Sequence, residues 1–365
     1  MRPANELELA EAIRDAAGPL RVVGGGTRSI GPAPVGEVLE TSGLSGISLY
    51  EPGALTIVAA AGTPLAQVEA ELARGGQRLP FEVPDLRGLL QREGVSTIGG
   101  VVAANASGPR RIQAGACRDS LIGVRFVDGV GTVIKNGGRV MKNVTGYDLV
   151  KLIAGSHGCL GVLSEVAFKV LPRPEVEATL IRDALDPAAA VQAMSQALGS
   201  PFEVTGAAYL GGQVRLRIEG MAGSVAYRTA ALAKLLGAGW QAVDAATSAA
   251  LWLEIRDVQA FAGKPGQVWR ISVKPSDMVQ VLAGLAGAQT LCDWGGGLIW
   301  ARVEEPVDVR GVIAPLGGHA SLIRAEAGFA QVPAFQPEAP AIAALTAGLR
   351  AKFDPKGTLN RSLMG

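Results

Sequence analysis

The sequence is poor in the residues that hold metals and disulfides. It has only two histidines and three widely spaced cysteines, Cys117, Cys159 and Cys292, and it contains no CxxC motif. Disulfide scaffolds, zinc ribbons and iron–sulfur sites need paired or clustered ligands. The sequence therefore predicts no metal site and no disulfide framework.

An excess of charge and long apolar runs are also lacking. Lys and Arg number 34 and Asp and Glu 33, giving a net charge of +1, whereas nucleic-acid binders usually carry a clustered basic excess. No run of about 18 uncharged apolar residues suggests a membrane-spanning helix, and the N-terminus lacks the apolar core of a signal peptide. We expect a soluble cytoplasmic protein without a nucleic-acid partner, and leave peripheral membrane attachment open.

Glycine is what the sequence has in surplus, with 49 of 365 residues, roughly twice the usual ~7%. The first cluster, Gly24-Gly25-Gly26, directly follows a short apolar strand, and its bare backbone N–H groups could cradle a phosphate. Thr27 and Ser29 add hydroxyl donors. A tight turn between strands explains the same pattern. No Gly-Lys-Ser/Thr of a Walker A loop follows, and the nearby prolines argue against a helix of the dinucleotide-binding GxGxxG type.

Two further runs of small residues strengthen the phosphate interpretation. Residues 97–108 contain Gly99-Gly100 and Ser107-Gly108, and residues 155–161 read Gly-Ser-His-Gly-Cys-Leu-Gly. Three separate loops without bulky side chains suit one long ligand lying against the backbone. A dinucleotide such as FAD has that length, although three unrelated turns remain an alternative.

Hydrophobic periodicity and turn residues predict an α+β protein. Asn5, with Glu8 three residues later, predicts the start of a helix. Strands are expected at 20–23, 38–40, 55–60, 124–127, 132–135, 162–171, 204–210, 213–219, 267–273, 298–303 and 320–324. Helices are expected at 64–74, 148–153, 187–198, 224–236, 246–257, 276–286 and 338–352, and residues 96–109 are expected to be irregular.

Three regions are expected from this pattern. Residues 1–174 form the first, with subdomains of about 1–80 and 81–174, and Pro172-Arg173-Pro174 ends it. Residues 175–337 form an α+β cap. Residues 338–365 form a C-terminal helix and a tail.

Several blocks make a family resemblance visible. STIGGVVAANASGPRR, RDSLIGVRFVDGVG and VMKNVTGYDLVKLIAGSHGCLGVLSEVAFKVLPRP resemble the FAD-binding domain of the vanillyl-alcohol-oxidase-like (PCMH-type) flavoproteins. Together with LWLEIRDVQAF, VWRISVKP, DWGGGLIWARV, GGHASLIRAEAG and KFDPKGTLN, they most resemble the FAD-binding subunits of bacterial glycolate oxidases. The resemblance extends over about residues 20–360 and implies a two-subdomain FAD-binding domain followed by a cap.

The resemblance also implies a cofactor site built from separate segments. The diphosphate would lie against Gly24, Gly25, Gly26, Thr27 and Ser29. The flavin and its linker would lie against Thr97, Gly99, Gly100, Ser107 and Gly108. The adenosine end would lie near Gly155, Gly158, Gly161, Glu165 and Val166, and Asn360 would return toward the cofactor.

Two departures from the family concern covalent attachment of FAD. Many relatives that attach FAD covalently carry a histidine in the first glycine loop, where this chain has Thr27 followed by Arg28. No cysteine falls within residues 97–108. We therefore expect FAD to be bound non-covalently.

Oxidation of a 2-hydroxy acid needs a hydride acceptor, a cation for the carboxylate and a base for the hydroxyl proton. His319 is the candidate base, with Arg324 or Arg270 as the cation. The alternative is that His319 is satisfied by backbone groups and that the arginines lie on a solvated strand face. The catalytic sibling subunit of glycolate oxidases carries His-rich motifs that this chain lacks.

The resemblance implies a heteromeric complex. Its other members would be a second, catalytic flavoprotein subunit and an iron–sulfur subunit, and the complex would oxidise glycolate, a small 2-hydroxy acid, to glyoxylate. Two alternatives stay open: a non-catalytic subunit that only holds FAD, and a free-standing FAD-dependent oxidoreductase for another hydroxy acid.

Overall fold

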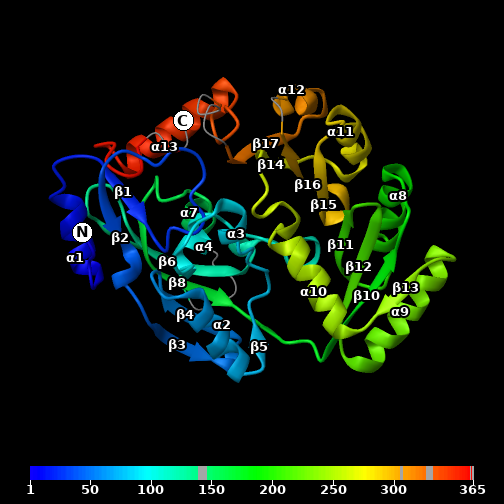
Figure 1. Cartoon of the computed structure of the whole chain (residues 1–365). Helices are drawn as coiled ribbons and strands as arrows, with labels where there is room; N and C mark the ends of the chain where they lie inside the picture. The colour runs from blue at the N-terminus through cyan, green and yellow to red at the C-terminus, as the bar shows by residue number, and fades with distance from the viewer. Residues whose placement is uncertain (139–145, 305–306, 326–331, 362, 364–365) are drawn as a thin grey trace.

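The computed structural model describes residues 1–138, 146–304, 307–325, 332–361 and 363, and it divides the chain into two halves that lie side by side (Figure 1). The matched block around residues 140–145 lies outside the described residues. Among the helices of the described residues, none is long and apolar enough to cross a bilayer.

The N-terminal half begins with a two-stranded parallel sheet. β1 (Leu20–Val23) pairs with β2 (Glu37–Glu40), and α1 (Glu6–Arg14) precedes them. The predicted start of α1 is confirmed: the Asn5 side chain accepts a hydrogen bond from Glu8 N at 2.9 Å, and the Glu8 carboxylate accepts one from Ala4 N at 2.8 Å. One free N–H group of the first helical turn, that of Glu8, and the N–H of Ala4 just before the helix are thereby satisfied.

A five-stranded antiparallel sheet forms the core of the same half. Its order is β3 (Ile47–Glu51), β4 (Thr56–Ala60), β8 (Val162–Lys169), β6 (Leu121–Val127) and β7 (Val133–Gly137). β4 pairs with β8 across the boundary that we expected near residue 80, so the break between the two sheets falls between β2 and β3 instead. Local sequence patterns could not reveal this pairing, because the two strands lie about 100 residues apart.

Short helices and one small strand pair complete this half: α2 (Leu65–Arg74), α3 (Arg87–Leu90), α4 (Ile98–Ala103), α5 (Arg111–Ala114), α6 (Cys117–Ser120), α7 (Leu149–Ile153), and β5 (Gln77–Arg78) paired with β9 (Leu171–Pro172). Val68 and Leu72 of α2 pack with Ile57, Val166 and Phe168 of the sheet in one apolar core. This core fixes the position of the loops that leave the sheet.

The second half is built on one eight-stranded sheet in which every pair of neighbouring strands is antiparallel. Their order is β13 (Gln241–Val243), β10 (Val176–Arg182), β12 (Gln213–Gly220), β11 (Val204–Leu210), β15 (Gln289–Asp293), β16 (Leu298–Val303), β14 (Gln267–Ser272) and β17 (His319–Arg324). α8 (Pro187–Leu198), α9 (Ala222–Leu236), α11 (Met278–Gly284) and α12 (Val309–Ile313) contribute to the core on one face. α10 (Ala245–Arg256) covers the other face, where Leu89 from the first half joins Trp252 and Phe261.

The C-terminal segment returns to the first half. After α13 (Pro340–Phe353), Leu20 N donates to Thr358 O at 2.7 Å and Asn360 N donates to Leu20 O at 2.9 Å. Leu359 thus adds a parallel bridge to β1. In Figure 1 the red C-terminal helix lies beside the blue N-terminal strands. The chain end is therefore placed against the strand that leads into the first glycine loop.

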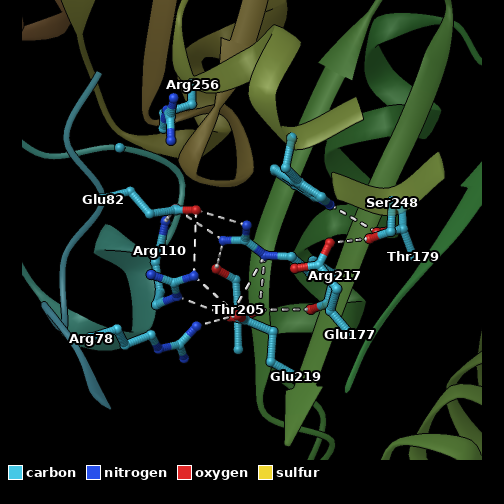
Figure 2. Close-up of polar contacts among 12 residues, drawn as sticks. Arg78, Glu82, Arg110, Glu177, Thr179, Thr205, Arg217, Glu219, Ser248 and Arg256 are labelled. Carbon is cyan, nitrogen blue, oxygen red and sulfur yellow. Dashed lines mark hydrogen bonds and ion pairs between the residues drawn. The ribbon is translucent and has the colours of Figure 1, made fainter. Parts of the chain in front are cut away.

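Buried ion pairs connect the two halves (Figure 2). The Arg217 guanidinium on β12 donates to both carboxylate oxygens of Glu82 at 2.9 and 3.0 Å, and Arg110 donates twice to Glu219 on β12, both at 3.0 Å. Arg78 adds a 2.6 Å bond to Glu219. Burial would raise the pKa of Glu82, but Arg217 and Arg110 outweigh it and lower that pKa to about 2. Charges from opposite halves therefore compensate one another across the junction.

Candidate FAD-binding site

A cleft of about 310 Å³ opens at the carboxyl end of β1. Gly24, Gly25 and Gly26 form its first wall, and Thr27 and Ser29 also line it. A Cβ on Gly25 would lie 1.5 Å from Val95 O, and Gly26 has a φ of +68°. The loop can pass this closely beside its neighbour only with glycine, because any larger residue would clash or strain the backbone.

The second wall is the start of α4, where we expected irregular structure. Thr97 caps this helix, since its Oγ1 accepts a hydrogen bond from Gly100 N at 3.3 Å. A Cβ on Gly99 would lie 2.7 Å from both the Cβ and the O of Ala61. Gly99, Gly100, Ala103 and Ala104 therefore give the cleft a helical wall without bulk.

The third wall joins the residues 156–161 to the C-terminal tail. Gly158 and Gly161 line the cleft, as does Asn360. The Asn360 amide accepts a hydrogen bond from Val22 N at 2.8 Å and donates one to His157 O at 2.7 Å. Asn360 thus connects β1 with the third wall of the cleft, and β1 leads directly into the first wall.

Polar groups in the cleft lack partners within the described part of the chain. Ser156 Oγ and Arg21 Nε are both buried without a hydrogen bond, and both residues line the cleft. Arg28 and Arg92 add positive charge to the lining. Buried polar groups are normally satisfied, so these atoms suit the phosphate and hydroxyl oxygens of a bound dinucleotide. The glycine walls, the unpaired donors and the cations together fit FAD.

Other predicted cofactor residues lie elsewhere. Glu165 and Val166 are in β8, where Glu165 accepts a 3.2 Å hydrogen bond from Ser48 and Val166 is fully buried. Gly155 N donates to Val102 O at 3.0 Å. None of these three lines the cleft. Their roles are in packing the sheet and closing a turn behind the third wall.

Ser107 and Gly108 also lie outside the cleft, at the junction with the cap. Ser107 accepts a 2.9 Å hydrogen bond from Arg111, and Gly108 O accepts one from Trp294 Nε1 at 3.1 Å. The segment that we assigned to the flavin thus leads from the cleft to the cap. It is the place where a ligand in the first half would meet residues of the second.

Cationic side chains gather around Trp294 at this junction. The Cζ atoms of Arg111 and Arg270 lie 4.7 and 5.2 Å from the centroid of the Trp294 ring. Burial and, to a smaller extent, the charge of Arg111 lower the pKa of Arg270 to about 10. Burial and both arginines also lower the pKa of His319. His319 is therefore neutral at pH 7, the state in which an imidazole can accept a proton.

Arg324, the other predicted carboxylate clamp, has a different environment. Its guanidinium donates to the backbone carbonyls of Leu89, Phe261, Lys264 and Gly266. These bonds join β17 to a loop of its own half and to α3 of the other half. We assign Arg324 a structural role and retain Arg270 as the candidate clamp.

Sequence reasoning missed several lining residues. Arg21 lies in β1, Ala61 directly follows β4, and His157 lies in the third glycine run; none was predicted as a cofactor residue, yet all three line the cleft. Burial lowers the pKa of His157 to about 4. Within the described residues, no cluster of His, Cys, Asp and Glu could hold a metal ion.

Comparisons with known proteins agree with this geometry. Residues 1–137 match the family model described as FAD binding domain. The whole chain superposes on alkyldihydroxyacetonephosphate synthase with a TM-score of 0.73 at 15% identity, covering 99% of this chain and 76% of that one. The fold class that we predicted is thereby confirmed. The protein is a flavoprotein of the PCMH type.

The particular family follows from the relatives. The glycolate oxidase subunit GlcE of Escherichia coli (strain K12) is 35% identical over 360 residues, which cover 98% of this chain and 95% of that protein. This chain belongs to the GlcE family. The glycolate oxidase subunit GlcD of Bacillus subtilis (strain 168) is 42% identical over 87 residues, which cover 24% of this chain and 18% of that protein.

Proposed function

We propose that this chain is the FAD-binding subunit of a heteromeric oxidoreductase that converts glycolate, a small 2-hydroxy acid, to glyoxylate. The observation that supports this most is the cleft, in which three glycine walls and unpaired buried donors come together. Similarity to a glycolate oxidase subunit along almost the entire chain supports the substrate. FAD, when bound, supplies the hydride acceptor.

The chain's own residues would hold the cofactor without a covalent bond. The first glycine loop carries Thr27, and no cysteine is among the described residues that line the cleft. Ser156 and Arg21 would donate hydrogen bonds to the cofactor's polar oxygens, and the glycine loop would offer backbone N–H groups. The FAD-binding unit would comprise residues 1–174 together with the tail from 338, and residues 175–337 would form the cap.

The cap would supply the groups that act on the substrate. Arg270 would bind the carboxylate, because its guanidinium is desolvated and makes no ion pair with any described residue. His319 would accept the proton of the 2-hydroxyl group, leaving the hydride at carbon 2 to be removed. The two neighbouring guanidiniums lower the pKa of the His319 imidazole and make it a weaker base. A substrate anion bound at Arg270 would offset part of their positive charge and so raise the basicity of His319.

Partners would complete the electron path. Three dispersed buried cysteines cannot ligate an iron–sulfur cluster, so a cluster that carries the electrons onward would lie in a separate iron–sulfur subunit. A second flavoprotein subunit would complete the complex. We place the complex in the cytoplasm, with any membrane attachment made through these partners.

The first test is the visible spectrum of the purified chain before and after anaerobic addition of glycolate. We expect flavin absorbance that acid precipitation releases into solution. Bleaching by glycolate would locate the whole active site in this chain, and bleaching only after addition of the partner subunits would make the site dependent on them. A folded, colourless chain that takes up no FAD would contradict the proposal.

A further inference from the structure

Two arginines from opposite halves lie against one tryptophan. Arg111 comes from α5 of the first half, and Arg270 from β14 of the cap. Because both guanidiniums contact the Trp294 ring, they lie within about 10 Å of each other. Trp294 itself is held by its Nε1 bond to Gly108 O across the junction.

Neither arginine forms an ion pair within the part of the chain that the structure describes, although the more distant carboxylate of Asp119 attracts Arg111. Within the described residues, the Arg111 guanidinium contacts the hydroxyl of Ser107 and the Trp294 ring, and the Arg270 guanidinium contacts the same ring. Asp293 is close in sequence to Trp294, but its carboxylate accepts a 2.7 Å hydrogen bond from Trp294 N. Burial raises the pKa of Asp293 to about 7, so it offers only partial negative charge.

Two half-buried cations without an ion-pair partner are unfavourable, because each loses hydration and repels the other. A bound carboxylate would relieve both costs. Guanidinium groups bind carboxylates through paired charge-assisted hydrogen bonds.

We propose that Arg111 and Arg270, both packed on Trp294, jointly bind the carboxylate of the small 2-hydroxy acid, so that the substrate site is complete only when both halves contribute. This inference rests on the proposed function and adds to it a binding residue, Arg111, from the FAD-binding half. Trp294 is a positioning residue, since it orients both guanidiniums.

The test measures binding of oxalate to the FAD-loaded full chain by calorimetry. Oxalate carries a carboxylate but no hydrogen on carbon, so it cannot be oxidised by hydride removal. Each hydrogen bond to a charged group contributes about 1.5–3 kcal/mol, so we expect Arg111→Gln and Arg270→Gln each to weaken oxalate binding at least about tenfold. Arg111→Lys keeps the charge but loses the paired geometry, and should lose less.

A double-mutant cycle decides whether the two arginines share one anion. Sharing predicts that the double variant Arg111→Gln/Arg270→Gln weakens binding clearly less than the product of the single effects. Arg74→Gln, an exposed arginine on α2 outside the cluster, is the control and should bind oxalate as the parent chain does. Additive effects, an unchanged affinity in Arg111→Gln, or no binding by the parent chain would overturn the inference.

Two readouts separate this inference from the proposed function. In the reconstituted complex, Arg111→Gln should raise KM for glycolate about tenfold while the amount of bound FAD stays unchanged. Normal KM with normal FAD content would overturn the role of Arg111 and leave the proposed function intact. Absence of FAD from the parent chain would overturn the proposed function itself.

Discussion

Replacing Arg217 by methionine should uncouple the two halves of the molecule. Arg217 is 1% exposed and makes two hydrogen bonds to Glu82, and its guanidinium lies 4.6 Å from the Trp252 ring. Breaking a buried ion pair from one side costs about 3–5 kcal/mol, because the other charge stays buried. Arg110 still donates its backbone N–H to Glu82 at 2.7 Å, so we expect the lower end, about 3 kcal/mol.

The assay is urea unfolding of the full chain, followed by tryptophan fluorescence and far-UV circular dichroism. Arg217→Met, Glu82→Gln and the double variant form a cycle, and the double variant should lose less free energy of unfolding than the two single variants together. Arg74→Met is the matched control, since its pair with Glu71 is exposed and should contribute at most about 1 kcal/mol. A loss below about 1 kcal/mol for Arg217→Met, or additive effects in the cycle, would refute the reasoning.

Three further predictions concern the cofactor, the base and acid stability. Ser156→Ala should weaken FAD binding about two- to tenfold in a fluorescence titration, because one hydrogen bond contributes about 0.5–1.5 kcal/mol; unchanged affinity would remove Ser156 from the site. His319→Gln should lower kcat with glycolate about 10²–10⁴-fold in the reconstituted complex while FAD content is kept; unchanged turnover would assign the base to a partner. The pKa of Glu82 is about 2 in the folded chain and ordinarily about 4.3, so its contribution to stability is present above about pH 4.3 and is lost as the pH falls toward 2. In Glu82→Gln, the stability measured by acid unfolding and circular dichroism should therefore depend less on pH over that interval. An unchanged dependence would contradict the pKa shift.

Local sequence signals predicted many elements well. The helix expected at 187–198 is α8, because the Asp186 side chain accepts a bond from Ala189 N and Pro187 suits the first turn. The strands at 204–210 and 213–219 form the pair β11–β12 around Gly211-Gly212. In both cases the residues that stabilise the element are neighbours in sequence, so the local sequence pattern is enough to predict it.

Elements that are stabilised by contacts with segments distant in sequence were missed or wrongly predicted. Residues 98–103 form a helix although they read as irregular, because Gly99 packs directly on Ala61 of a distant segment. The strands β10 and β15 had no predicted counterpart, and tertiary pairing in the eight-stranded sheet stabilises both. Propensity alone could not find them.

The same limit applies to the candidate site. The glycine runs predicted the walls of the cleft, since a missing Cβ is visible in the sequence. The approach of Arg111 to Trp294 and the unpaired state of Ser156 depend on contacts between segments more than 100 residues apart or on the absence of a partner in space. Such features become visible only in the folded chain.

The central claim is that FAD occupies the cleft between the glycine walls, and blocking that cleft tests it most directly. Ala104 lines the cleft at the end of α4, whereas Ala343 is exposed on α13. We would measure acid-released FAD per chain for the parent, Ala104→Trp and Ala343→Trp, each checked for folding by circular dichroism. The account predicts about one FAD per chain in the parent and in Ala343→Trp and little or none in Ala104→Trp; a folded Ala104→Trp chain that keeps its full FAD content would contradict it.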